Sequence, residues 1–389
     1  MTTADIGRAV PFATCEIIPE ARAAALAVLE SGWVTTGPRT AQFEHQLARW
    51  VGAEHAVAVS SCTAAIELSL RALRLPAGSP VLSPTLTFCG AVHAIVHAGL
   101  RPVLVDVDEA TLTLRPRDVA SAAERSGARA MVVQHMAGYP APVAELAAAA
   151  GLDPAHVVED AAHGLGAAAG PDPVGSAPGA TCFSFYATKN LPIGEGGAVT
   201  TADPELADLL RQSRQHGMSR DAWRRYHPGS GWRYSVEVDG MKANFTDLQA
   251  AIGSAQLTRL EGWQARRAEL ADRYDAALRD VPGLTPPPRP VTGRHAWHLY
   301  VLRVGPGYRL TRDALAAALA ERGVGTSVHF IPVHHFPYFR ALLGAPHLPV
   351  ADQVFDGLLS LPLHPALADA DVDHVCALIT DLGRRGGSP

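Results

Sequence analysis

Lysine is almost absent from this chain, although other basic residues are common. Of the 33 basic residues only two, Lys189 and Lys242, are lysine, and the other 31 are arginine. Arginine stays protonated and cannot form an imine, whereas lysine can lose its proton and attack a carbonyl group. The two lysines are therefore candidates for positions where arginine cannot do the chemistry. The alternative is that they are chance survivors on the surface.

The chain also lacks a basic excess, a long apolar run and a metal-binding cysteine pattern. With 33 Lys+Arg against 38 Asp+Glu its net charge is −5, which argues against nucleic acid or an anionic membrane as the main partner. No stretch reaches the ~18 consecutive apolar residues of a membrane helix, and the first residues do not have the pattern of a secretion signal. Its five cysteines are widely spaced without a zinc pattern, so we expect reduced thiols in a cytoplasmic protein.

Short β-branched runs alternate with alanine- and leucine-rich helical stretches from about residue 55 to 200. Strands are expected at 55–59, 81–83, 102–106, 130–133 and 157–160, with helices at 63–73 and 89–97. This alternation predicts an α/β fold with a mostly parallel sheet covered on both faces. In such sheets, ligands bind at the carboxyl ends of the strands.

The second half of the chain has a different pattern. Thr246 and Gln249 form a capping box, which is expected to open one long helix whose apolar positions continue to Leu278. Five prolines lie between 282 and 290, and they interrupt regular structure. A strand is expected at 297–304 and helices at 310–322 and 371–382. We therefore predict a large α/β domain over 1–250 and a smaller α+β domain over 251–389.

Lys189 lies in a segment with unusual turn chemistry. A strand with alternating bulky residues precedes it, and Gly194, Gly196 and Gly197 follow before the next strand. Glycines so placed let the backbone approach a flat ligand or bend sharply. A tight surface turn carrying an exposed lysine has the same local pattern.

A carboxylate ends one of the apolar strands. Asp160 follows three apolar or acidic strand residues, and His163 comes three positions later. A buried carboxylate needs a partner, and a protonated pyridine nitrogen is one such partner. A helix N-cap is the ordinary alternative for Asp160, and a buried core residue is the ordinary alternative for His163.

A phosphate site and a stacking ring complete the candidate set. Small residues at 60–65 lead from a strand into a helix, so amides at the helix N-terminus can bind an anion, with Ser184 as a further hydroxyl donor. Phe88 follows the next strand and can lie against a flat ring. A structural turn and a core phenylalanine are the alternatives. Together with Lys189 and Asp160, these groups match the contacts that pyridoxal phosphate requires.

The sequence resembles the DegT-type sugar aminotransferases (the DegT/StrS group), over nearly the whole chain. The matching motifs are 31–38 with Phe43-Glu44, 61–65, 87–88, 159–163, 183–190, 194–197, 216–217, 240–251, 297–298 and His329. The resemblance implies the aspartate-aminotransferase-like fold (fold type I), with a pyridoxal-phosphate-binding large domain and a smaller C-terminal domain. It also implies a homodimer with shared active sites.

The family pattern assigns roles residue by residue. Lys189 would carry the cofactor as the internal aldimine and shuttle protons, and Asp160 would hold the ring nitrogen. His163 would lie on the phenolic oxygen side, and Phe88 would stack on the ring. The phosphate would be bound by Cys62, Thr63 and Ser184, joined by a group from the second subunit.

The chain departs from the family pattern at two places. The family usually has asparagine two residues after the glycine matching Gly240, and arginine two further on, but here Lys242 and Asn244 stand there. Which of these two reaches the phosphate across the dimer interface stays open. Cys62 replaces a usual glycine or alanine and crowds the phosphate turn.

The resemblance also suggests the reaction. The motifs at 216–223 and Gly240-x-Lys242-x-Asn244 are similar to those of members that aminate the C4 ketone of nucleotide-linked sugars, of the 4-amino-arabinose and bacillosamine type. We expect transfer from glutamate or glutamine through pyridoxamine phosphate, with Thr36, His298 and His329 as candidate substrate contacts. Other members aminate C3 ketones or cyclitol ketones with glutamine, and these remain alternatives.

Three other interpretations are weighed against this one. Sugar dehydratases of the same fold have histidine at the position of Lys189, so the lysine argues against them. A non-catalytic regulator would not need Lys189 and Asp160, and no helix-turn-helix segment or basic face indicates DNA binding. His329, His334 and His335 suggest a metal, but no carboxylate or cysteine stands at ligand spacing, so no metal is expected.

Overall fold

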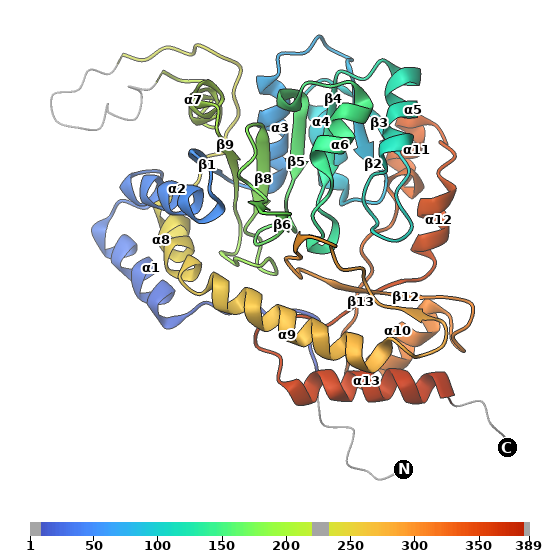
Figure 1. The fold of residues 1–389 in the computed structure, drawn as a ribbon. Coiled ribbons are helices and arrows are strands. Elements are labelled where there is room, and N and C mark those ends of the chain that lie inside the picture. Colours follow the sequence, from blue (N-terminus) through green and yellow to red (C-terminus); the bar gives the residue numbers. More distant parts are fainter. Residues whose placement is uncertain (1–8, 220–232, 385–389) are drawn as a thin grey trace.

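The computed structural model describes residues 9–219 and 233–384 (Figure 1). Its centre is a seven-stranded sheet in the order β1-β9-β8-β5-β4-β2-β3. The strands are β1 (His55–Val59), β2 (Pro80–Pro84), β3 (Arg101–Val105), β4 (Ala130–Gln134), β5 (Val157–Asp160), β8 (Ala180–Ser184) and β9 (Gly197–Thr201). Only β9 runs antiparallel to its neighbours in this sheet, and the other pairs are parallel. The predicted α/β class and mostly parallel sheet are confirmed.

Helices cover both faces of this sheet because alternate strand residues point to opposite sides. Val57 and Val59 share a core with α3 (Cys62–Ala72), α4 (Cys89–His97) and α7 (Pro204–Ser213). Ala56 and Ala58 belong to a second core with α2 (Pro38–Val51). A third core joins the sheet to α5 (Pro116–Ser126) and α6 (Val143–Ala150). None of the helices in the described ranges has the length and apolar character needed to cross a membrane.

The single long helix predicted after Thr246 is wrong, because the structure has two helices. The capping box is present, and α8 (Asp247–Leu257) ends before α9 (Leu260–Leu278) begins. The Thr258 hydroxyl donates to the Ala255 carbonyl at 2.7 Å, which occupies a carbonyl in the last turn of α8.

The buried face of α8 is formed by small residues more than by its large apolar ones. Its buried positions include Ala250, Ala251 and Gly253, whereas Leu248 and Ile252 are only half-buried. A Cβ at Gly253 would lie 2.8 Å from a ring carbon of Phe43 on α2. Small residues therefore set this face, since they let the two helices approach closely.

A second, antiparallel sheet lies beside α9 (Figure 1). Its strands are β10 (Leu284–Thr285), β12 (Tyr300–Val304) and β13 (Leu358–Leu361), and its core includes α9, α10 (Arg312–Ala320) and α13 (Asp369–Arg384). The strand predicted from 297 begins only at Tyr300, because Trp297 has a left-handed φ of 47°. Val10, from the N-terminal end, also packs in this core. The division at residue 250 stays a prediction.

The remaining elements connect these two sheets. α1 (Pro19–Ser31) packs on α8, and a small sheet has the order β11-β6-β7. The other bounds are β6 (Ala168–Ala169), β7 (Asp172–Pro173), β11 (Gly293–Arg294), α11 (Pro337–Leu343), α12 (Pro349–Phe355), η1 (Met136–Gly138), η2 (Pro154–His156) and η4 (Val333–His335).

Candidate active site

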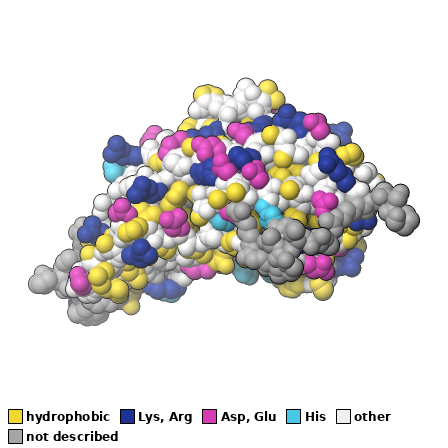
Figure 2. Space-filling model, turned by 90° about the horizontal axis from the view of Figure 1, so that it is seen from below, with side chains coloured by type: hydrophobic (Ala, Val, Ile, Leu, Met, Phe, Trp, Pro, Cys, Tyr) yellow, Lys and Arg dark blue, Asp and Glu magenta, His cyan; other side chains and the backbone are white. Residues whose placement is uncertain are grey.

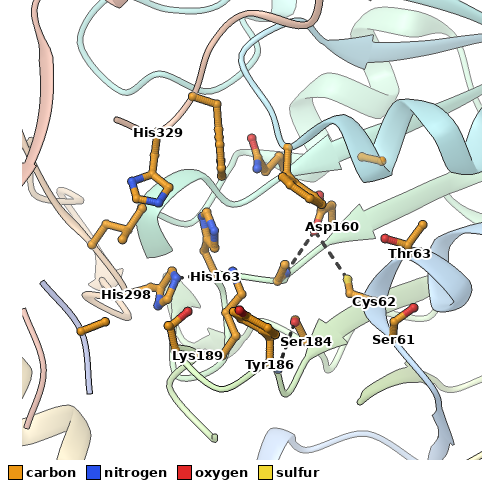
Figure 3. A pocket seen from close by; sticks show the side chains of 18 of the residues that line it. Ser61, Cys62, Thr63, Asp160, His163, Ser184, Tyr186, Lys189, His298 and His329 are labelled. Atoms are coloured by element: carbon orange, nitrogen blue, oxygen red, sulfur yellow. Dashed lines mark hydrogen bonds between the residues drawn. The ribbon is translucent and has the colours of Figure 1, made fainter. Parts of the chain in front are cut away.

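A cavity of about 530 Å³ lies at the carboxyl ends of β4, β5 and β8 (Figure 3). Residues that precede β12 and residues that follow β13 help to enclose it, so both sheets contribute to its wall. Nine of the twelve predicted site residues line it: Cys62, Thr63, Phe88, Asp160, His163, Ser184, Lys189, His298 and His329. Figure 3 shows Lys189 and the imidazoles on one side and the N-terminus of α3 on the other.

The turn after β8 presents Lys189 to the cavity. The Lys189 amide donates to the Tyr186 carbonyl at 2.9 Å, which closes the turn. Burial lowers the pKa of the Lys189 amine from 10.5 to about 8, and the nearby Asp160 carboxylate opposes that shift. Burial disfavours the charged ammonium, so a larger share of the amine is unprotonated near neutral pH than in free lysine.

His298 lies within hydrogen-bond distance of that amine. Its Nε2 lies 3.4 Å from Lys189 Nζ, and its Nδ1 lies 3.2 Å from Asn190 Oδ1. Asn190 Nδ2 donates to two backbone carbonyls, those of Leu165 and Ala296, which fixes the orientation of the amide. An amide oxygen only accepts, so His298 Nδ1 carries the proton and Nε2 presents a lone pair to Lys189. Burial also lowers the pKa of His298 well below its ordinary value.

Asp160 ends β5 under the cavity, beside Gln134 at the end of β4, and the two are register partners. Asp160 Oδ1 accepts from the Ala162 amide at 3.1 Å, and burial raises the pKa of the carboxyl. Gln134 Oε1 is buried and has no hydrogen-bond partner among the described residues. A buried carboxylate and a buried unpaired amide oxygen in one wall indicate that a polar ligand belongs in the cavity.

The opposite end of the cavity is built at the N-terminus of α3. Ser61 is the N-cap, and its Oγ accepts from the Ala64 amide at 3.1 Å. Thr63 and Ser184 line the same end. A Cβ at Gly90 would lie 2.7 Å from Thr63 Oγ1, so glycine keeps that hydroxyl accessible. Free amides of a first helical turn with adjacent hydroxyls form an anion site.

The Cys62 side chain points away from this anion site. Its Sγ lies 3.7 Å from Asp160 Oδ1 and 3.4 Å from the Cys182 carbonyl oxygen. Burial, followed by the negative charge of Asp160, raises the pKa of the Cys62 thiol well above its usual value. The thiol therefore contacts the carboxylate, and the phosphate-binding role of Cys62 stays a prediction.

Two further imidazoles and a phenylalanine complete the wall. The Ala137 amide donates to His163 Nδ1 at 3.2 Å, and the His163 ring lies 4.4 Å from that of His298. Burial lowers the pKa of His329 to about 4, and its ring stacks on Phe12. Phe88 lies at the cavity edge with 57% of its surface exposed. These imidazoles are therefore neutral at physiological pH.

Three predicted site residues do not line this cavity. Asn244 Nδ2 donates to Thr36 Oγ1 at 2.9 Å, so these two lie together elsewhere on the chain, and Lys242 is exposed. Lys242 also pairs with Gln215 in an isolated bridge. Their predicted contacts with the phosphate and the substrate stay predictions. Residues 220–223 of the 216–223 motif lie outside the described part of the chain.

Several residues that line the cavity were not predicted as site residues, including Gln134, Tyr186, Glu195, Phe12 and His364. Tyr186 and Glu195 lie inside the motifs around Lys189. Gln134 ends a buried strand as Asp160 does. Because ligands bind at the carboxyl ends of parallel strands, its position in the sequence was sufficient to predict it as a site residue. Phe12 and His364 come from the two ends of the chain, and no sequence signal indicates them.

The expectation from linear spacing that no carboxylate accompanies His334 and His335 does not hold in three dimensions. Asp352 Oδ1 lies 2.9 Å from His334 Nε2 and 2.7 Å from His335 Nε2, so a carboxylate does accompany these histidines. It comes from α12, after a helix and a loop, and linear spacing could not indicate it. These three residues do not line the cavity.

The cavity residues fit pyridoxal phosphate, as shown by the buried amine, the buried carboxylate with the unpaired Gln134 oxygen, and the open N-terminus of α3. With a mostly parallel seven-stranded sheet, they define a pyridoxal-phosphate-dependent transaminase of fold type I.

Comparison with known proteins gives the family. A family model described as the DegT/DnrJ/EryC1/StrS aminotransferase family matches residues 16–380, and the chain belongs to this family. It is 45% identical over 358 residues to the spore coat polysaccharide biosynthesis protein SpsC of Bacillus subtilis (strain 168), covering 91% of this chain and 92% of that protein.

Solved structures agree. DesV of S. venezuelae, in complex with a ketimine intermediate, is 34% identical with a TM-score of 0.87, covering 97% of this chain and 99% of DesV. The putative sugar aminotransferase Spr1654 of Streptococcus pneumoniae, in its PLP form, is 26% identical with a TM-score of 0.88, covering 97% of this chain and 99% of that one. The protein is thus a pyridoxal-phosphate-dependent sugar aminotransferase of amino-sugar biosynthesis.

Proposed function

We propose that this enzyme transfers the amino group of glutamate or glutamine to the C4 ketone of a nucleotide-linked keto sugar. The observation that carries the proposal is the Lys189 amine, with its pKa of about 8, between the Asp160 carboxylate and the His298 lone pair. The C4 position is supported by the Gly240-x-Lys242-x-Asn244 motif and its resemblance to C4-aminating members.

The two ends of the cavity would bind different parts of the cofactor. Asp160 would face the ring nitrogen, and its burial makes a cationic partner favourable. Thr63, Ser184 and the first amides of α3 would hold the phosphate. Phe88 would cover one face of the ring and His163 the phenolic oxygen side. When bound, pyridoxal phosphate supplies an aldehyde that takes up the amino group and a ring that withdraws electrons from the reacting carbon.

Lys189 would move the proton, with His298 as its hydrogen-bond partner. An unprotonated Lys189 amine can accept a proton from the substrate carbon and return it on the acceptor side, which is general base and then general acid catalysis. His298 Nε2 accepts a hydrogen bond from that amine, because Asn190 holds the opposite ring nitrogen protonated. His329 would contact the substrate from the side of Phe12.

We infer that two chains share their active sites. Thr36, Lys242 and Asn244 lie outside the cavity of their own chain, so their predicted contacts require a second copy. Leu26 and Leu29 on α1 are 55% and 54% exposed, close in sequence to Thr36. Figure 2 shows hydrophobic side chains gathered at the end of the molecule where α1 lies. Such a surface favours a homodimer interface.

The cytoplasm is the proposed location. All five cysteines are free, and four of them are buried or partly buried. Free thiols are typical of a reducing compartment.

The proposal is tested with a matched panel of acceptors. The purified enzyme would be incubated with 4-keto and 3-keto sugars, each with and without the nucleotide, and with a keto cyclitol, using glutamate or glutamine as donor. Amination at C4 of the nucleotide-linked sugar, located by NMR, is expected. Product only from the 3-keto sugar or the cyclitol would refute the C4 assignment, and no amine exchange with either donor would favour a regulator.

A further inference from the structure

Two histidines and an aspartate meet outside the cavity. His334 and His335 lie in η4 and Asp352 in α12, and the ligand atoms of the three lie within 4.8 Å of one another. Both imidazole Nε2 atoms point at the same carboxylate oxygen, at 2.9 Å and 2.7 Å. The cluster therefore already has the convergent geometry of a small binding site.

The rest of the structure holds these side chains in place. The Val333 amide donates to the Thr85 carbonyl at 2.8 Å, which anchors η4 to the loop after β2. Thr85 Oγ1 lies 2.7 Å from His334 Nδ1. A hydrogen bond at Nδ1 leaves Nε2 as the ligand atom, and it is the usual second contact of a metal-binding histidine. The start of α12 is fixed as well, because Asp106 accepts from the amides of Val350 and Ala351.

The donor set and its exposure suit a cation. Two imidazoles and one carboxylate form the open three-ligand set that zinc accepts, with water as the fourth ligand. The Asp352 side chain is 47% exposed and that of His335 is 32% exposed, so an ion can enter from solvent. In the part of the chain that the structure describes, Asp352 has ion pairs with these two histidines and with no lysine or arginine. No fixed side-chain cation therefore competes for the carboxylate.

We propose that His334, His335 and Asp352 bind one divalent transition-metal ion of the zinc class. Nitrogen and oxygen ligands around a tetrahedral zinc lie about 3.3 Å apart, so the present distances must widen by about half an ångström. The half-exposed Asp352 side chain can make that adjustment by rotation.

The site has a structural role, because none of its ligands lines the cavity. The ion fastens η4 to α12. η4 follows His329 and Phe330, and the Thr85 loop leads to Phe88, and all three of these aromatic residues line the cavity. Metal binding should therefore stiffen one wall of the active site without taking part in the chemistry.

The experiment uses cofactor-saturated enzyme without an affinity tag, dialysed against EDTA and then titrated with ZnCl₂ by calorimetry. The wild type is expected to bind one ion per chain. His335→Ala and Asp352→Asn should each weaken binding at least tenfold, since even outer-shell changes cost about 10–100-fold. The matched controls are His347→Ala and Asp356→Asn, which change exposed residues close to the cluster in sequence, and both variants should bind the ion as the wild type does.

Cobalt(II) gives a readout that does not depend on the variants folding. Bound to wild type, it should show the visible absorption of a four-coordinate ion with nitrogen and oxygen ligands. Absence of wild-type binding, or unchanged affinity in both ligand variants, would overturn the proposal. So would loss of the ion on Cys15→Ser, because that would place it on the exposed thiol.

Discussion

The acidity of Lys189 is the property from which the chemistry follows, and it can be measured directly in the cofactor-free protein. With a pKa of about 8, about a quarter of the Lys189 amine is unprotonated at pH 7.5. An amine with the ordinary pKa of 10.5 would be unprotonated to only about one part in a thousand at that pH. The difference is about 240-fold in the population of the reactive form. The cause is burial, which the neighbouring Asp160 carboxylate partly offsets.

The perturbation that separates these two causes is Asp160→Asn. It removes the negative charge that favours the ammonium, so the pKa of Lys189 should fall below its wild-type value. Binding of the cofactor should weaken in the same variant, because the ring nitrogen loses its partner. The variant should therefore combine a lower pKa of Lys189 with a weaker affinity for the cofactor. General unfolding would not produce this combination, because it would return the pKa of Lys189 toward the ordinary value.

The assay is trace acetylation with acetic anhydride across pH 6 to 11, read by mass spectrometry of the two lysine peptides. Since Lys189 and Lys242 are the only lysines, each signal has one source. N-acetyl-lysine amide serves as an external reference. Reactivity of Lys189 should rise with pH to a midpoint near 8. A midpoint near that of the free amine, or an upward shift in Asp160→Asn, would refute the reasoning.

Three further outcomes are expected. Lys189→Ala should abolish turnover yet bind the cofactor non-covalently; normal turnover would exclude the proposed role. Arg214→Ala should lower the free energy of unfolding by about 3–5 kcal/mol in urea denaturation, because it leaves the buried Glu44 carboxylate uncompensated; the exposed Arg273→Ala, as control, should lose far less. Thr246→Ala should lower the free energy of unfolding by about 1 kcal/mol because α8 loses its N-cap, whereas Thr246→Ser should retain the cap. Equal losses in the two variants would contradict the capping role of Thr246.

Much of the site was predictable because it depends on strand ends. Asp160 and Ser184 each end a strand of the sheet, and Lys189 follows the second of these strands. Parallel strands bring their carboxyl ends to one edge, so linear sequence was sufficient to expect these groups in one place. The five strands predicted between residues 55 and 160 each match the structure to within one residue at either end.

Contacts between distant segments could not be predicted in the same way. Asn190 and His298 are 108 residues apart, and the tautomer of His298 depends on the carbonyls that orient the Asn190 amide. Asp352 contacts His335 because α12 lies against η4, although the two residues are 17 positions apart. These features are set by tertiary packing, which periodicity does not encode.

The direct test of the active site is to reduce the pyridoxal-phosphate-saturated enzyme with borohydride, digest it and locate the modified residue by mass spectrometry. The expected result is a cofactor adduct on Lys189, with Lys242 unmodified, and loss of that adduct when the amino donor is added before reduction. An adduct on Lys242, or none on either lysine, would contradict the assignment of Lys189 as the residue that binds the cofactor.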